Sequence, residues 1–308
     1  MVPEFERAGL TVLERGWLSS NNVLFAGDGD AHETVLVDTG YWSHAAQTVA
    51  LVRRVLNGRP LARIVNTHLH ADHCGGNQAL QHAFDCAIDV PAGEAAKVDR
   101  WDEAALTYRA TGQHCPRYRR TGVLAAGTEQ RLGAWPWQVI GSPGHDPESV
   151  VLYQPELELL ISADALWENG FGLVFPELDG AGGFDDVRQT LDRIAGLRVR
   201  RVIPGHGRPF DDFEAALARA RRRLDGLAAD PTRHAGHAAR VLLKFHLMGL
   251  HAQSRTELMA WLDATAILVA IQRRFFGTLS YRDWCDRLIG ELQKSGALRV
   301  HDETIENS

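Results

Sequence analysis

The sequence predicts a mixed α/β fold that ends in a mainly helical region. Up to about residue 209, short apolar β-branched runs alternate with segments of helical periodicity. Beyond that point the composition changes to Ala, Arg and Leu at helical spacing. The chain has 308 residues and 45% hydrophobic content, enough to bury a large core beside a second, smaller domain. We therefore expect an α/β domain over residues 1–209 and a helical domain over residues 210–308.

The α/β part opens with strands and continues with strands and helices. An antiparallel meander is expected first, because strand-like segments follow one another with turn residues between them. The predicted elements are strands at 10–14, 22–26 and 34–38, helices at 43–56 and 77–83, strands ending at Thr67, Ile140, Ala163 and Ile203, and a helix at 184–196. Periodicity alone predicts no more than mixed α and β structure.

The C-terminal region contains successive helical segments. Helices are expected at 210–228, 238–250, 254–262 and 281–294, and residues 295–300 supply a C-cap glycine and a short strand. Helix, turn, helix and strand is also the skeleton of a winged helix. The alternative is a helical cover that packs on the α/β part or mediates formation of a homodimer.

The densest group of ligand-type residues lies on one loop. This loop carries His68, His70, Asp72 and His73. It follows the apolar run 62–67, which predicts a buried strand. Imidazole nitrogen and carboxylate oxygen suit zinc and related metals, and a catalytic site takes about three protein ligands per metal. Because a loop lets the first two side chains point one way and the last two another, two adjacent metal ions are expected.

Three further candidate ligands follow other predicted strands. His145 lies on a Gly/Pro turn, Asp164 directly follows an apolar run, and His206 lies in a Pro-Gly-His-Gly turn. A lone histidine is more often a packed or surface residue than a ligand. Together, however, the four loops carry seven candidate ligands at strand ends, and chance explains that pattern poorly.

With these motifs the chain resembles the metallo-β-lactamase superfamily, whose pattern is HxHxDH, a single His, a bridging Asp and a final His. The resemblance covers roughly residues 10 to 210 and implies an αββα sandwich, in which the first domain is catalytic and the helical region is an extension. The implied ligands of the first metal are His68, His70 and His145, those of the second are Asp72, His73 and His206, and Asp164 bridges the two.

Two other acidic roles are expected. Asp38 lies in a Val-Asp-Thr-Gly strand end that matches the family, where this Asp supports the ligands. An Asp before Thr-Gly also commonly caps a turn, so we assign Asp38 a supporting role. Asp72 is the candidate to orient the nucleophile or accept its proton.

The expected reaction is hydrolysis of an ester-type bond. Two divalent ions about 3.5–4 Å apart can lower the pKa of a bridging water and so supply hydroxide. Zn²⁺ is the expected ion, and Mn²⁺ or Fe²⁺ also suits these ligands. The resemblance favours the glyoxalase II-like and lactonase-like branch, hence a thioester or a lactone. True β-lactamases are disfavoured, because they lack an Asp at the bridging position and are exported.

Two alternatives stay open. One is a phosphodiesterase or ribonuclease of the same fold. The other is a persulfide dioxygenase, in which a single iron is held by residues of the type of His68, His70 and His145.

Two loops are expected beside the metals. Residues 167–176 form an apolar aromatic loop directly after the bridging Asp, and residues 100–127 are long enough to act as a lid. Aromatic walls with a few polar groups suit a small or medium organic substrate. We expect Tyr108, His114 and Trp167 to contact it, although such rings can also serve only to pack the lid.

Charge and cysteine usage limit the partners and the location. The net charge of −6 argues against a nucleic-acid partner without excluding one. A cluster on the predicted helix at 210–228 could contact phosphate, but such a run is usually a solvated helix face; it comprises Arg219, Arg221, Arg222 and Arg223. The four cysteines form no CxxC pair, and no segment resembles an export signal or a membrane span. A cytoplasmic enzyme with a small-molecule substrate is expected.

Overall fold

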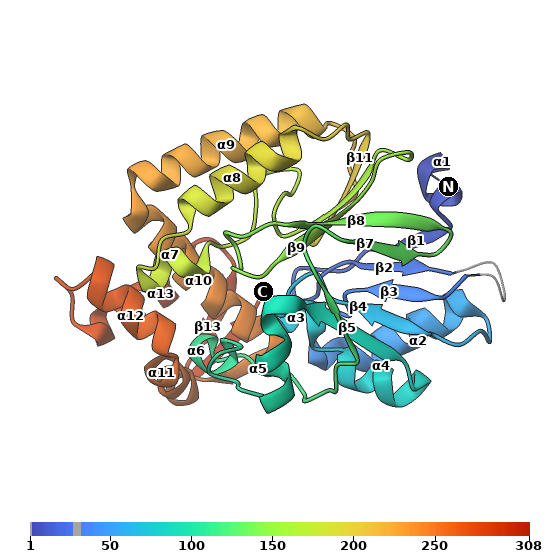
Figure 1. The fold of residues 1–308 in the computed structure, drawn as a ribbon. Helices are drawn as coiled ribbons and strands as arrows, with labels where there is room; N and C mark the ends of the chain where they lie inside the picture. Colours follow the sequence, from blue (N-terminus) through green and yellow to red (C-terminus); the bar gives the residue numbers. More distant parts are fainter. Residues whose placement is uncertain (1, 27–31) are drawn as a thin grey trace.

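The computed structural model describes residues 2–26 and 32–308 and has the αββα architecture (Figure 1). In this described part of the chain, two sheets lie face to face as the middle layers. The first has the order β1 (Leu10–Leu13), β2 (Asn22–Phe25), β3 (Val35–Val37), β4 (Arg63–Val65), β5 (Ala87–Pro91), β6 (Gly122–Leu124). The second has the order β11 (Arg201–Pro204), β10 (Leu159–Ala163), β9 (Val150–Gln154), β8 (Trp135–Gly141), β7 (Glu129–Leu132). The expected fold class is confirmed.

Strand direction decides where the loops of interest emerge. In the first sheet, β3 to β6 are mutually parallel, and Val65 of β4 pairs with Val37 of β3 and Asp89 of β5. In the second sheet, β10 and β11 are parallel, with a register shift between Ile161 and Ala163. Carboxyl ends of neighbouring parallel strands lie at the same edge of a sheet. The segments that carry the ligand-type residues therefore leave β3 and β4 together, and likewise β10 and β11.

Helices α2 (Ala45–Leu56) and α4 (Asn77–Phe84) cover the first sheet. Their side chains Leu56 and Leu80 are fully buried and join one apolar cluster with Ile64 of β4. Burying an aliphatic side chain of this size contributes about 1.5–3 kcal/mol to folding. The helical layer thus fixes the strand that leads directly into the ligand loop.

Helices α8 (Phe184–Ala195) and α9 (Phe213–Ala229) cover the second sheet (Figure 1). On α8, Val187, Leu191 and Ile194 are buried and follow the spacing of one helix face. They share an apolar cluster with buried side chains of α9 and of the sheet. The helix nearest the predicted domain boundary therefore packs on the α/β part, and the boundary itself stays a prediction.

The space between the sheets is filled by large apolar side chains. Trp137 is fully buried and meets Phe25 edge to face, with 5.4 Å between ring centroids. Val65, Leu152 and Ile161 belong to the same cluster. This core holds the two sheets against each other, so that loops from both can meet at one end. Shorter helices complete this part, namely α1 (Pro3–Ala8), η1 (Trp42–His44), α3 (Ala71–Cys74), η2 (Ala92–Glu94), α5 (Ala95–Arg100), α6 (Tyr108–Thr111) and α7 (Phe175–Asp179).

The C-terminal region is mainly helical, as expected, and its apolar cluster also includes Leu173 and Leu178 of the α/β part. Its helices are α10 (Pro231–Leu250), α11 (Arg255–Ala264), α12 (Ala266–Phe275) and α13 (Tyr281–Lys294). A small sheet with the order β12 (Ala252–Ser254), β14 (Thr304–Asn307), β13 (Leu298–His301) closes it. Whether this region acts as a winged helix, a cover or a dimer interface stays a prediction. No helix in the described residues is long and apolar enough to cross a membrane.

Local capping explains where the structure departs from the predicted helices. α10 starts at Pro231 rather than near residue 238, because the Asp230 carboxylate accepts a hydrogen bond from the Arg233 backbone N–H. At the start of α11, Ser254 and Glu257 form a reciprocal capping box. Local sequence patterns do not predict α12, β12 or β14, because short segments of this kind depend on packing within the region.

Candidate metal centre

The ligand-type residues occupy loops at the ends of four strands. β4 leads into the loop with His68 and His70, and Asp72 and His73 lie on the short helix α3 that follows. His145 follows β8, Asp164 follows β10 and His206 follows β11. The structure brings all seven together, in overlapping groups whose ligand atoms lie within 4.8 Å of one another: His68, His70 and His145; His68, His73 and Asp164; Asp72, His73 and His206.

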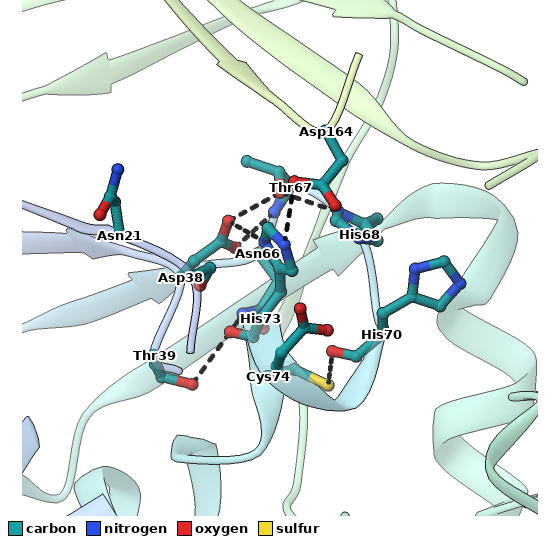
Figure 2. A network of polar contacts seen from close by, with 12 residues as sticks. Asn21, Asp38, Thr39, Asn66, Thr67, His68, His70, His73, Cys74 and Asp164 are labelled. Atoms are coloured by element: carbon teal, nitrogen blue, oxygen red, sulfur yellow. Dashed lines mark hydrogen bonds and ion pairs between the residues drawn. The ribbon is translucent and has the colours of Figure 1, made fainter. Parts of the chain in front are cut away.

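Asp38 holds the ligand loop in place. Figure 2 shows its carboxylate beside Thr67 and His73. One oxygen accepts from the Thr67 backbone N–H at 2.9 Å, and the other accepts from the Thr67 hydroxyl at 2.8 Å. The second oxygen also lies 2.7 Å from His73 Nδ1. Asp38 has a φ of 56°, in the left-handed region, as does Ala163 with 46° just before Asp164. Such strained positions persist where surrounding contacts over-determine them.

The first triad consists of His68, His70 and His145. His145 Nε2 lies 3.2 Å from His68 Nε2 and 2.7 Å from His70 Nδ1. His145 Nδ1 lies 2.5 Å from the Leu173 carbonyl oxygen, to which it must donate. In neutral imidazole the other nitrogen is then an acceptor, so a lone pair faces the two neighbouring rings. A metal ion fits this convergence, since three imidazoles cannot satisfy one another by hydrogen bonding alone.

The second triad consists of Asp72, His73 and His206. His206 Nε2 lies 3.1 Å from an Asp72 oxygen, Oδ2. His73 donates through Nδ1 to Asp38, which directs its Nε2 into the site. That Nε2 is buried and makes no hydrogen bond of good geometry, although Asp164 Oδ1 lies 3.3 Å away. A histidine fixed through one nitrogen, with the other left for the centre, is typical of a metal ligand.

Asp164 lies between the two triads. Its Oδ1 is 3.3 Å from His73 Nε2, and its Oδ2 is 3.4 Å from His145 Nε2. Two glycines allow this close approach. A Cβ at Gly205 would lie 2.2 Å from Asp164 Oδ1, and one at Gly172 would lie 2.5 Å from His145 Nδ1. In the sequence, Gly205 is recognisable only as part of a turn, and no pattern distinguishes Gly172 within its loop.

The two triads differ in charge. Burial lowers the pKa of His70 and of His145 to about 4. Burial also opposes protonation of His73, but the carboxylates of Asp164 and Asp38 outweigh it and raise the pKa of His73 well above its ordinary value. For Asp164, burial favours the neutral acid, yet His73 and His206 outweigh it and hold the pKa of Asp164 well below its ordinary value. The first triad is thus neutral, and the second is an ionic cluster.

A cavity of about 90 Å³ lies above both triads. Its walls include Trp167 and Phe175 of the loop after β10, as expected, and the Trp167 Nε1–H donates to Asp164 Oδ1 at 3.2 Å. Helix α10 adds Val241, Leu242 and Phe245. The C-terminal region therefore contributes part of the cavity wall, as the expected alternative of a helical cover on the α/β part would.

The other expected substrate residues lie elsewhere. Tyr108 is 2% exposed, and its hydroxyl donates to the Leu69 carbonyl oxygen at 2.9 Å beneath the ligand loop. His114 is exposed and meets Trp42 edge to face at 4.9 Å. Gln113, its neighbour on the predicted lid, lines the cavity. This arrangement favours a packing role for Tyr108.

Two residues near the N-terminus were missed. Trp17 lines the cavity and stacks on His206, with 5.5 Å between ring centroids and an interplanar angle of 10°. The Asn21 side chain donates to the carbonyl oxygens of Pro204 and Gly207 at 2.9 and 2.7 Å, and so holds the turn that carries His206. Neither contact has a sequence signal, because both partners are nearly 190 positions away.

Comparison with known proteins agrees with this geometry. The model of the metallo-beta-lactamase superfamily matches residues 15–206. The hydroxyacylglutathione hydrolase of Bdellovibrio bacteriovorus is 26% identical over 186 residues, which cover 59% of this chain and 61% of that protein. The hydroxyacylglutathione hydrolase of Rhizobium meliloti is 33% identical over 148 residues, which cover 48% of this chain and 47% of that protein. The chain thus spans less than two thirds of either relative.

Solved structures share the architecture. A beta-lactamase domain protein from Burkholderia ambifaria, 22% identical, aligns over 97% of this chain and 91% of its own with a TM-score of 0.58. That likeness extends through the C-terminal helices. A protein solved in a di-iron-bound form, 28% identical, aligns over 68% of this chain and 98% of its own with a TM-score of 0.53.

Proposed function

Because the chain belongs to the metallo-beta-lactamase superfamily, we propose that it is a hydrolase that holds two divalent metal ions and cleaves an ester-type bond. One observation carries this proposal. The two carboxylate oxygens of Asp164 face different triads, at 3.3 Å from His73 and 3.4 Å from His145. A buried carboxylate in that position is suited to bridge two ions. A site for a single ion needs only one of the triads.

In this proposal each triad holds one ion. The first ion takes His68, His70 and His145, the second takes Asp72, His73 and His206, and Asp164 is shared. When bound, two such ions activate water for attack at neutral pH and polarise the oxygen of the bond to be cleaved. Zn²⁺ is the proposed ion, and Mn²⁺ and Fe²⁺ suit the same ligands.

The chain's own side chains would supply orientation and protection from solvent. Asp72 lies at the cavity wall and is the proposed group to orient the attacking water or accept its proton. Trp167 donates to Asp164 Oδ1 and so fixes the direction of the shared carboxylate. The rings of Phe175 and Phe245 line the same cavity, where they would exclude bulk water from the reacting bond.

A thioester is the proposed substrate class, and a lactone is the second choice. The support is the name of the relatives, hydroxyacylglutathione hydrolases, together with a narrow cavity that has apolar walls. Cytoplasmic location is part of the proposal. The alternatives are a phosphodiesterase or ribonuclease, and a persulfide dioxygenase with one iron in the first triad.

The test is a set of initial rates on acyl thioesters, lactones and phosphodiesters, measured on the zinc-loaded and the manganese-loaded protein. Asp164→Asn serves as the control, and metal content is measured in parallel. Thioester or lactone hydrolysis that falls by on the order of 10³-fold in the control supports the proposal. Phosphodiester turnover would move the assignment to nucleic-acid or nucleotide processing. Oxygen uptake by a one-iron preparation would move it to the dioxygenase.

A further inference from the structure

The cavity at the metal centre continues into a larger one between the loop after β10 and helices α9 and α10. This larger cavity has a volume of about 440 Å³. The two cavities share wall residues, namely Trp17, Trp167, Leu173, His206 and Val241. The passage between them is therefore mostly apolar. A substrate held at the metals has room to extend along α9 and α10.

The far end of the larger cavity is basic. Arg223 of α9 and His237 of α10 line it, and both also line a neighbouring cavity of about 430 Å³. The other charged residues around that neighbouring cavity are Arg222, Arg233 and Arg240. Among the described residues that line it, none is acidic. We name this group of four arginines and His237 the basic chamber. It occurs in a chain whose net charge is −6.

Arg223 is fixed by contacts on several sides and has one N–H group without a partner. Its guanidinium lies over the Phe171 ring, 5.6 Å from the centroid, and its Nη2 lies 3.2 Å from His237 Nε2. Its stem passes so close to Gly170 that a Cβ there would lie 2.9 Å from Arg223 Cδ. The Nε atom is buried and has no hydrogen-bond partner. A buried N–H without an acceptor is costly, even on a guanidinium that is only partly buried, unless an acceptor meets it.

Arg221 of α9 has a carboxylate partner, whereas three of the four arginines of the chamber have none among the described residues. Arg221 pairs with Asp192 at 2.7 Å, outside the chamber. Arg240 pairs with Glu291 at 2.9 Å. Within the described chain, by contrast, no carboxylate lies within ion-pair distance, 4.0 Å, of Arg222, Arg223 or Arg233. Burial lowers the pKa of Arg223, and the charge of Arg233 adds to this effect. Arg222, Arg223 and Arg233 therefore bring together positive charge that no carboxylate among the described residues offsets at ion-pair distance, whereas the charge of Arg240 is offset by Glu291.

We propose that the basic chamber binds phosphate groups on the thiol half of the substrate, so that the substrate is an acyl thioester whose thiol carries phosphates at its far end. This proposal rests on the proposed function and adds a substrate class to it. Arginine forks pair with phosphate oxygens in a bidentate manner, and several of them together match a polyanion better than a single carboxylate. The apolar passage fits an uncharged spacer between the phosphates and the reacting acyl group.

The kinetic test compares thioesters that share one acyl group. These are acetyl coenzyme A, in which the thiol half carries phosphates, S-acetylpantetheine, in which it carries none, and S-acetylglutathione, in which it carries carboxylates. The wild type is expected to prefer the first by at least about tenfold in kcat/KM. In R222Q/R233Q that preference should fall about tenfold through a higher KM, as expected for loss of charge-assisted hydrogen bonds. The matched control Arg221→Gln removes a paired arginine of the same helix and should keep the preference. Equal kcat/KM for acetyl coenzyme A and S-acetylpantetheine, or a preference for S-acetylglutathione, would overturn the proposal.

A binding measurement separates failure of this proposal from failure of the proposed function. Adenosine diphosphate has no thioester and no thiol, so its affinity, measured by calorimetry, depends on the chamber and not on hydrolysis. Binding that weakens at least about tenfold in R222Q/R233Q but not in Arg221→Gln supports the chamber even when no thioester is hydrolysed. Absence of binding, or equal effects of both variants, rejects it. Displacement by an RNA oligonucleotide at lower concentration than adenosine diphosphate would assign the arginines to nucleic acid instead and would also reject it.

Discussion

The two triads differ in how the protein prepares them for a metal ion. The first is made of imidazoles alone, and burial holds the pKa of His70 and of His145 to about 4, so these rings are neutral near pH 7. The second contains the Asp72 carboxylate, and the surrounding carboxylates raise the pKa of His73 well above its ordinary value. A metal ion needs neutral imidazole and ionised carboxylate. The first triad is therefore ready for an ion near pH 7, whereas the second has to release a proton.

The largest effect is expected from loss of a ligand in the first triad. His145→Gln removes the nitrogen on which His68 and His70 converge. Hydrolysis should fall by on the order of 10³-fold, because the ion's stabilisation of developing charge is worth several kcal/mol. Metal content should fall from the two ions of the proposed centre to about one. Rates on a thioester and elemental analysis of the purified protein are the measurements.

The control for this variant is His234→Gln. His234 is also buried, but its Nε2 accepts from the Val174 backbone N–H at 3.2 Å and lies outside both triads. The His234→Gln variant should keep both ions of the proposed centre and most of the hydrolysis rate. Equal losses of metal in the two variants would mean that any buried histidine supports the fold here, and the triad assignment would be wrong.

The next effect should single out the second triad. Asp38→Asn weakens the partner that fixes His73 directly through Nδ1 at 2.7 Å, whereas Asp38 reaches the first triad only through Thr67, whose hydroxyl lies 3.2 Å from His68 Nδ1. Loss of such a supporting carboxylate typically lowers metal affinity 10- to 100-fold. Stepwise metal titration followed by calorimetry should show weaker binding of one ion and unchanged binding of the other.

Asp89→Asn is the matched control for Asp38→Asn. Asp89 is likewise buried on the first sheet, but it pairs with Arg63 at 2.9 Å. The Asp89→Asn substitution should leave the binding of both metal ions unchanged. Weakening of both steps in Asp38→Asn would show that this residue supports the whole ligand loop rather than one triad.

The pH dependence of stability should also separate the triads in the metal-free protein. For His70 and His145, the folded pKa of about 4 lies below the ordinary value of 6.5. Between those values the unfolded chain binds more protons, so the free energy of unfolding falls as pH is lowered. As the pH is lowered through this window, each ring reduces the free energy of unfolding by roughly 2–3 kcal/mol. His73 has the opposite sign: its contribution is present below pH 6.5 and is lost as pH rises through its raised folded pKa.

The measurement is urea unfolding of chelator-treated protein between pH 7 and pH 4.5. His70→Gln should lose less stability on acidification than the wild type does, because one buried neutral imidazole is gone. A parallel loss in both proteins would contradict the assigned pKa of His70.

The sequence predicted which ligand-type residues lie together, and it indicated little about the side chains that surround them. His68, His145 and His206 could be found because each lies in a short motif at the end of an apolar strand, and strand ends of one sheet meet in space. Trp17 and Phe245 could not be found, since they reach the cavity only through the packing of distant segments. Periodicity predicts most helices of the C-terminal region, but the packing of α10 against the cavity depends on contacts that local periodicity does not encode.

Tyr108 shows the limit for single aromatic residues. Its place on an aromatic loop that is long enough to act as a lid predicts a contact with the substrate. The structure instead places its hydroxyl on the Leu69 carbonyl oxygen and 3.2 Å from the Cys74 sulfur, beneath the ligand loop. An aromatic ring with one polar atom suits a cavity wall and a buried packing site equally well, and only the tertiary contacts distinguish them.

The smallest effect is expected from Trp167→Phe. The ring is retained at the cavity wall, but the Nε1–H that donates to Asp164 Oδ1 at 3.2 Å is lost. That oxygen faces His73, so the change should act on the second triad more than on the first. A neutral side-chain donor to a carboxylate is worth about 1.5 kcal/mol, which predicts a loss of up to about tenfold in kcat/KM and a small weakening of one ion. Metal titration alongside kinetics distinguishes two causes of a lower rate. Weaker binding of the ion already affected by Asp38→Asn would confirm the direction of the Asp164 carboxylate. A lower rate with both ions bound as in the wild type would mean that the indole contacts the substrate.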